Sequence, residues 1–161
     1  MAGFLFYSNL IVNIYTMRFL ILFLLCNITL FGQVKIEGFN SSYQSQVESA
    51  LLLIKEKDDF KYSRLIEFCK IIKYSESGTS RTENDSIIVI PQSVLGTESV
   101  NKIACSIIHE TKRLELRIKK FGYTSKKEEY TCYAYEYAFS CRINCEDWLK
   151  EQIQEALIQN Q

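Results

Sequence analysis

The chain has 161 residues, which suits one domain with a hydrophobic core and is short for two. Its composition, 47% hydrophobic and 24% charged, is that of a globular protein and excludes a disordered one. The 19 basic and 19 acidic side chains cancel, so no overall field favours nucleic acid or an acidic membrane. With one proline and six glycines, an all-β sandwich with many tight turns is also disfavoured.

The N-terminal segment differs in composition from the rest. Residues 19–25 form an unbroken apolar run, Arg18 precedes it and Gly32 follows as a small residue. A positive residue, an apolar stretch of about 7–15 residues and a small exit residue are typical of a secretory signal peptide. We therefore expect residues 1–32 to be a signal peptide, with Met17 as the true start, that exports the protein to a periplasmic or extracellular location.

The alternative for this segment is an uncleaved membrane anchor. Residues 4–31 are long enough to include a span of about 20 residues, but Arg18 and Asn27 lie badly within it. After the signal peptide, residues 33–42 are short and polar and are expected to be a linker. The folded domain then covers residues 43–161.

Five cysteines follow the signal peptide, namely Cys69, Cys105, Cys132, Cys141 and Cys145. An odd number leaves at least one thiol free, even in an oxidising compartment. Cys141 and Cys145 are four residues apart on a helical stretch, a spacing that seldom permits a disulfide. Any bridge is therefore expected to join different helices, for example Cys105 to Cys132.

Two helices are predicted at the start of the domain. Residues 42–57 place Val47, Leu51 and Ile54 on one side at helical spacing, and a second helix is predicted over residues 62–72. A polar loop over residues 75–85 follows.

A short strand comes next. Residues 86–90 are rich in β-branched side chains, and Pro91 ends the run. Proline suits an edge strand or the end of a strand, so we predict a short edge strand here.

Two long helical regions complete the chain. The first is predicted from Gly96 or Thr97 to Phe121, with a clean apolar stripe and Gly122 as the left-handed stop. The second begins with a capping box at residues 125–128, runs to about residue 142, bends near Asn144 and continues to about residue 157. The order helix, helix, strand, helix, helix predicts an α+β domain that is mostly α.

One motif stands out within the first long helix. His109 is the only histidine of the chain, and residues 109–113 read His-Glu-x-x-Arg. In the motif His-Glu-x-x-His, two histidines face one zinc ion, and the glutamate activates the bound water. Arg113 stands at the second histidine position, where its guanidinium has no lone pair for a metal and would repel zinc.

Two glutamates on the following helix have suitable positions to complete such a site. Glu129 and Glu136 are seven residues apart and lie on one helical face, with Tyr133 between them. Beside an intact motif, Glu129 would be the third metal ligand and Glu136 an alternate or supporting one. Beside Arg113 we expect an ion pair instead, so that a guanidinium stands where the metal would stand. The alternative is that both glutamates are solvated surface residues.

On these residues and the order of its elements, the chain resembles small zincin-like domains of the gluzincin type from about residue 45 to residue 143. Such minimal metallopeptidase domains occur as secreted or toxin-associated modules. The resemblance implies a zinc ion, peptide hydrolysis and a strand that pairs with extended substrate. It makes His109 the first ligand, Glu110 the general base and Glu129 the third ligand. Because Arg113 departs from the pattern, we expect zinc to be weak or absent and full peptidase activity to be lost.

Other interpretations stay open. An active metallohydrolase would need a different second ligand, such as Cys105, or a second glutamate. A structural zinc site would use Cys105, His109 and Cys132. In a helical structural or interaction protein the His-Glu pair would be coincidental.

The partners expected from the sequence follow from these interpretations. A peptide or protein partner would bind by strand addition, no nucleic acid is expected, and a membrane is involved only through an N-terminal anchor. The basic residues from Lys112 to Lys127 are interpreted as a solvated face, because Glu110 precedes them, Glu115 interrupts them and the protein is expected to be exported. The alternative is that they bind an anionic surface or nucleic acid.

Overall fold

A computed structural model describes residues 34–161 of the chain. The predicted signal peptide and its alternative, the membrane anchor, lie outside the described residues. Within residues 34–161, no helix is both long enough and apolar enough to span a membrane.

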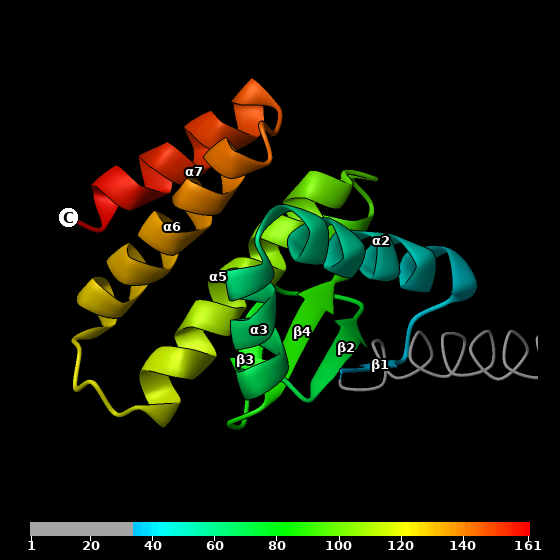
Figure 1. The fold of residues 1–161 in the computed structure, drawn as a ribbon, viewed down its shortest axis with the longest axis horizontal. Helices are drawn as coiled ribbons and strands as arrows, with labels where there is room; N and C mark the ends of the chain where they lie inside the picture. Colours follow the sequence, from blue (N-terminus) through cyan, green and yellow to red (C-terminus); the bar gives the residue numbers. More distant parts are fainter. Residues whose placement is uncertain (1–33) are drawn as a thin grey trace, which may run out of the picture. The chain divides into compact units, whose positions relative to one another are not determined.

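The described chain folds into a mostly helical α+β domain, as the sequence predicts (Figure 1). In chain order its elements are β1 (Lys35–Glu37), α2 (Ser41–Lys57), α3 (Asp59–Phe68), β2 (Ile71–Ser75), β3 (Arg81–Glu83), β4 (Ile87–Pro91), α4 (Gln92–Leu95), α5 (Val100–Ile118), α6 (Ser125–Arg142) and α7 (Asp147–Gln159).

The four strands form one sheet in the order β1-β2-β4-β3. Strands β1, β2 and β4 are parallel, and β3 is antiparallel to β4. The predicted edge position of β4 is therefore wrong, because β4 has a neighbour on each side. Its apolar residues Ile88, Val89 and Ile90 are all buried, as is usual for an interior strand covered on both faces. Pro91 is tolerated because it is the last residue of the strand.

Three further strands were not predicted. The second predicted helix extended to Ile72, but α3 ends at Phe68, where Cys69 turns to an extended conformation, and Ile71 begins β2. Strand β3 lies in the predicted polar loop, and β1 lies in the predicted linker. These strands are three to five residues long and gain their hydrogen bonds from neighbours distant in sequence, so a local pattern carries little signal for them.

The predicted long helices are confirmed, with shifted ends. The side chain of Ser99 accepts a hydrogen bond from the backbone N–H of Lys102 and caps α5. Thr124 caps α6 through the N–H of Lys127, one residue earlier than the predicted capping box. Near Asn144, where φ is 49°, the chain reverses into an α6–α7 hairpin rather than bending within one helix (Figure 1).

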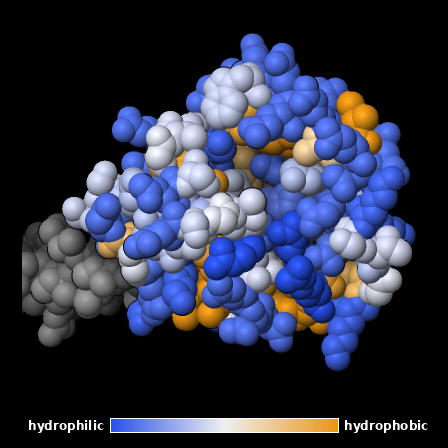
Figure 2. Space-filling view, turned by 180° about the vertical axis from the view of Figure 1, so that it is seen from behind, coloured by the Kyte–Doolittle hydropathy of each residue, from blue (hydrophilic) through white to orange (hydrophobic). Residues whose placement is uncertain are grey.

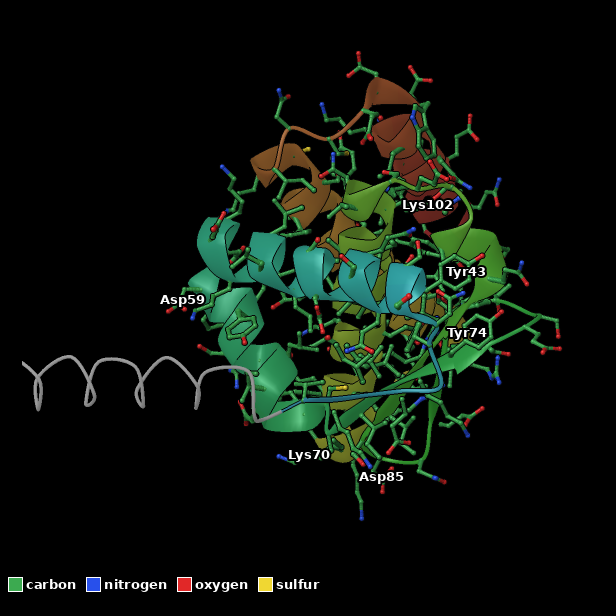
Figure 3. The ribbon with its side chains drawn as sticks, turned by 90° about the vertical axis from the view of Figure 1, so that its right-hand side faces the viewer. Tyr43, Asp59, Lys70, Tyr74, Asp85 and Lys102 are labelled. Carbon is green, nitrogen blue, oxygen red and sulfur yellow. The ribbon has the colours of Figure 1, made fainter. Side chains whose placement is uncertain are left out.

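Helix α5 is central to the domain, since it contacts α2, α3, α4, α6, β3 and β4. Helix α2 also contacts the sheet near its first turn. There the ring of Tyr43 stacks on the ring of Tyr74 from β2, with centroids 6.0 Å apart (Figure 3). The face of the molecule in Figure 2 is mainly hydrophilic, with small separate hydrophobic patches. Because α5 is surrounded by the elements that it contacts, polar side chains in the middle of this helix need partners within the protein.

Candidate functional site

Every site residue that the sequence predicts meets in one place, between α5 and α6. His109, Glu110 and Arg113 project from the middle of α5, and Glu129 and Glu136 project from α6. Glu110 is only 2% exposed, His109 6% and Glu136 7%. Glu136 is therefore buried, whereas the side chain of Glu129 is 30% exposed but is paired with Arg113, so neither glutamate is the solvated surface residue of the alternative interpretation.

Arg113 lies at the centre of this group. Its Nη1 donates to both carboxylate oxygens of Glu110, at 2.7 and 2.8 Å. Its Nη2 donates to both oxygens of Glu129, at 2.5 and 2.7 Å. The structure thus contains the expected ion pair between Arg113 and Glu129. Paired charges of this kind are the form in which buried ions are stable.

His109 lies between Arg113 and the second glutamate. Its Nδ1 is 2.8 Å from Oε2 of Glu136, and its Nε2 is 2.9 Å from Nη2 of Arg113. Arginine can only donate, so this second contact requires a lone pair on Nε2 and the tautomer in which Nδ1–H donates to Glu136. The ring of Tyr133 packs edge-on at 4.5 Å between centroids and closes the remaining side.

Two influences on the protonation of His109 oppose each other. Burial lowers its pKa, but hydrogen bonds to Glu129 and Glu136 outweigh burial and raise the pKa to about 9. A protonated ring, however, cannot accept from Arg113. We favour the raised pKa, because the three carboxylates outnumber the single guanidinium. Protonation of Nε2 therefore requires the ring to exchange its contact with Nη2 of Arg113, at 2.9 Å, for Oε2 of Glu129, which lies 3.6 Å away.

Glu110, the expected general base, is engaged by Arg113. Burial raises the pKa of Glu110, and the guanidinium of Arg113 acts in the opposite direction. Both carboxylate oxygens accept from the same Nη1, so the group is held by a cation and not directed at a water molecule. In this arrangement Glu110 is a structural counter-ion.

The residues as arranged do not fit a zinc ion. The space between His109 Nε2 and Glu129 is taken by Arg113 Nη2, which has no lone pair to offer a metal. Across residues 34–161, no set of three or more His, Cys, Asp or Glu side chains is placed to hold a metal ion. The expected first ligand, base and third ligand are together, but the guanidinium lies between His109 and Glu129.

The cysteines do not supply a replacement site. All five cysteines of the described chain are free thiols, so the expected disulfide between helices is not formed there. Cys105 and Cys132 are fully buried, and burial raises the pKa of Cys132 to about 12 and that of Cys105 further. Both are neutral thiols packed in the interior, and neither lines the cleft described next.

A cleft of about 580 Å³ opens beside the charged group. Its walls come from β3 and the loop before it, from α5 and α6, and from α7. The wall residues beyond the charged group are Thr79, Ser80, Arg81, Val94, Lys102, Ser106, Arg117, Tyr133, Leu149, Gln152, Ile153 and Ala156. Lys102, near the start of α5, is labelled in Figure 3.

Some of these wall residues could have been found from the sequence. Ser106 and Lys102 precede His109 by three and seven residues, so they share its face of the helix. Leu149, Ile153 and the residues before β3 could not be found, because nothing local indicates that α7 and β3 flank α5. Glu128, expected to cap α6, lies instead 3.2 Å from Nε of Arg117.

The charge network makes the stability of the protein depend on pH in acid. Hydrogen bonding from His109 and the charge of Arg113 outweigh burial and lower the pKa of Glu129 from 4.5 to about 2. A carboxylate with a lowered pKa contributes stability that is complete above its unfolded pKa and is lost as pH falls. We expect the difference in unfolding free energy between wild type and Glu129→Gln to be constant from pH 4.5 to 6.5, below the range in which His109 loses its proton, and to shrink between 4.5 and about 2. Urea unfolding at several pH values measures this difference, and a difference that grows toward acid would contradict the network.

Comparison with known proteins adds no functional assignment. No family model, no curated protein and no solved structure matches this chain.

Proposed function

We propose that this chain is a degenerate zinc-peptidase-like protein that lacks peptidase activity and binds a peptide or protein segment in the cleft beside α5. The observation that carries the proposal is the position of Arg113. Its guanidinium lies within hydrogen-bond distance of His109, Glu110 and Glu129, the three residues that would serve metal and water in a zinc peptidase. A fixed cation there keeps the group folded and leaves no Lewis acid.

Hydrolysis by another route is not supported by the geometry. The contact of His109 with Glu136 is similar to the base and orienting carboxylate of a serine hydrolase. The Nε2 atom, which would have to receive the proton of a nucleophile, faces Arg113 instead. A metallohydrolase with an unconventional ligand would require Arg113 to leave the group, and Cys105 is packed away from the cleft.

Strand β3 supports the binding part of the proposal. It is the edge strand next to the cleft, and the loop that leads into it forms part of the cleft wall. An extended segment that pairs with the free edge of β3 would pass along the cleft, where main-chain hydrogen bonds give affinity. Its apolar side chains would meet Leu149 and Ile153 of α7.

Filling the cleft should abolish this binding. Gln152 is exposed on α7 and lines the cleft, whereas Gln154 is exposed on the same helix and does not. We expect peptides selected on the wild-type protein from a displayed library of random sequences to lose at least about tenfold in affinity for Gln152→Trp, because the indole takes their place. The same peptides should bind Gln154→Trp as they bind wild type. A library that yields no binder, or binders that tolerate both variants equally, would overturn the proposed peptide site.

A further inference from the structure

The turn between α5 and α6 concentrates positive charge. Residues 116–127, here called the basic turn, read Leu-Arg-Ile-Lys-Lys-Phe-Gly-Tyr-Thr-Ser-Lys-Lys and contain five basic and no acidic side chains. The whole chain has 19 of each sign, so the rest of the protein carries an acidic excess of five (19 acidic against 14 basic). The charge is therefore strongly asymmetric although its total is zero.

The basic turn also exposes large hydrophobic side chains. Phe121 is 49% exposed and Ile118 is 39% exposed. Lys120 and Gly122 have positive φ values of 50° and 63°, which reverse the chain and place Phe121 between them at the tip. The ring of Phe121 stacks on the partly exposed ring of Tyr123 with centroids 5.6 Å apart, and the ammonium group of Lys127 lies 4.5 Å from the centroid of Tyr123.

The cations of the basic turn are only partly neutralised. Lys119 pairs with Glu115 at 2.6 Å and Arg117 with Glu128 at 3.2 Å. No ion pair is found for Lys120 or Lys126 among the described residues. The ammonium groups of Lys120 and Lys126 therefore leave positive charge on the basic turn that no carboxylate of the described residues neutralises.

Two acidic residues lie before or within the basic segment in the sequence, but in space Glu110 does not oppose the basic turn and Glu115 neutralises only Lys119 of it. Glu110 is buried against Arg113, and Glu115 is engaged by Lys112 and Lys119. The interpretation of this segment as an ordinary solvated face depended in part on those two glutamates. Neither of them pairs with Lys120 or Lys126, so the tip keeps its positive charge.

We propose that the basic turn is an interaction surface for an anionic phospholipid bilayer. Phe121 and Ile118 would enter the headgroup region, and Lys120 and Lys126 would meet lipid phosphates. Binding to the interface of an anionic bilayer requires hydrophobic side chains close to lysines. Each lysine adds electrostatic attraction to the lipid phosphates, and the apolar side chains add free energy of insertion.

A pocket beside the turn fits the same ligand. It has a volume of about 430 Å³, and Lys126, Lys127 and Tyr130 form part of its wall. It can take one phosphate-bearing headgroup. Nucleic acid also attracts lysines, but it gains little from an exposed aliphatic side chain such as Ile118, whereas a bilayer does. This surface lies at the end of α5 away from Lys102, and the proposal does not depend on what the cleft binds.

The test is partition of the full chain onto vesicles of phosphatidylcholine alone and with about 30% phosphatidylglycerol, a fraction that gives a strongly negative surface. The measured quantity is the ratio of the two partition coefficients, so any binding by the N-terminal segment that ignores lipid charge cancels. We expect Lys120→Gln with Lys126→Gln to reduce this ratio about 25-fold, at about fivefold per lysine. The matched control is Lys57→Gln with Lys73→Gln, which removes two exposed lysines on α2 and β2 and should change the ratio less than about twofold.

A second variant tests insertion. Phe121→Ser should weaken partition onto the anionic vesicles about tenfold through the loss of buried apolar area, with no change in net charge. Equal ratios for the two lysine pairs would overturn the proposal. So would binding of a short DNA duplex that depends on Lys120 and Lys126 without vesicle partition, which would assign the basic turn to nucleic acid.

Discussion

Replacing Arg113 by histidine is expected to convert a protein that takes up no zinc into one that takes up about one zinc ion per chain. The substitution removes the guanidinium that lies 2.9 Å from His109 and places a second imidazole one helical turn away, facing the same space. Glu129, released from Arg113, can then complete a three-residue ligand set. Zinc content after dialysis against an excess of the metal measures the result.

The control for this experiment is Arg117→His. Arg117 lies four residues further along α5 and is exposed, so the substitution adds a histidine while leaving Arg113 in place. We expect this variant to take up no zinc, and we expect the same of the wild-type protein. Zinc in the wild-type protein would favour a metallohydrolase with an unconventional ligand set. A zinc-free Arg113→His variant would make the His-Glu pair coincidental and favour a helical interaction protein.

Replacing Arg113 by methionine should destabilise the domain by about 3–5 kcal/mol, because it leaves buried carboxylates without their cation. Glu110 is 2% exposed and Arg113 provides its only ion pair among the described residues. For a domain of this size the loss corresponds to a fall in Tm of roughly 10–20 °C. Thermal and urea unfolding measure it, with Arg117→Met as the exposed control expected to change stability by less than about 1 kcal/mol.

A second substitution, at Glu110, distinguishes the loss of the ion pair from the loss of side-chain packing as the cause of destabilisation. Adding Glu110→Gln to Arg113→Met removes the stranded charge, so we expect the double variant to be more stable than Arg113→Met alone. The apparent destabilisation of Arg113→Met should also shrink in acid, where Glu110 takes up a proton, since burial raises its pKa. If Arg113→Met unfolds within about 0.5 kcal/mol of wild type, the buried network does not hold the helices together.

The sequence was sufficient for the helices that carry the site. The apolar stripe of α5 and the spacing of Glu129 and Glu136 on α6 are local patterns, and local patterns determine which side chains share a helical face. The expected pairing of Arg113 with Glu129 followed from charge alone, because a buried guanidinium needs a carboxylate. The division of roles did not follow, since Glu136 binds His109 rather than Arg113.

The sheet and the cleft were decided by tertiary structure. Pro91 predicted that β4 would be an edge strand. Its position between β2 and β3 depends on pairing with other segments of the chain, which Pro91 does not indicate. Strand β3 is three residues long and exists as a strand only because β4 offers hydrogen bonds. The part of the cleft wall that α7 provides was not predicted either, because it also depends on contacts between segments distant in the chain.

The chemistry of the candidate site could be read from the sequence. The charge of Arg113 and its lack of lone pairs are properties of one side chain and hold in any fold. The tertiary structure was needed to show that the guanidinium lies between His109 and Glu129, that β3 is the edge strand beside it, and that Lys120 and Lys126 have no ion pair among the described residues. These features depend on which surfaces of α5 are covered by other elements. Packing between segments distant in the chain decides this, and no local sequence pattern encodes such packing.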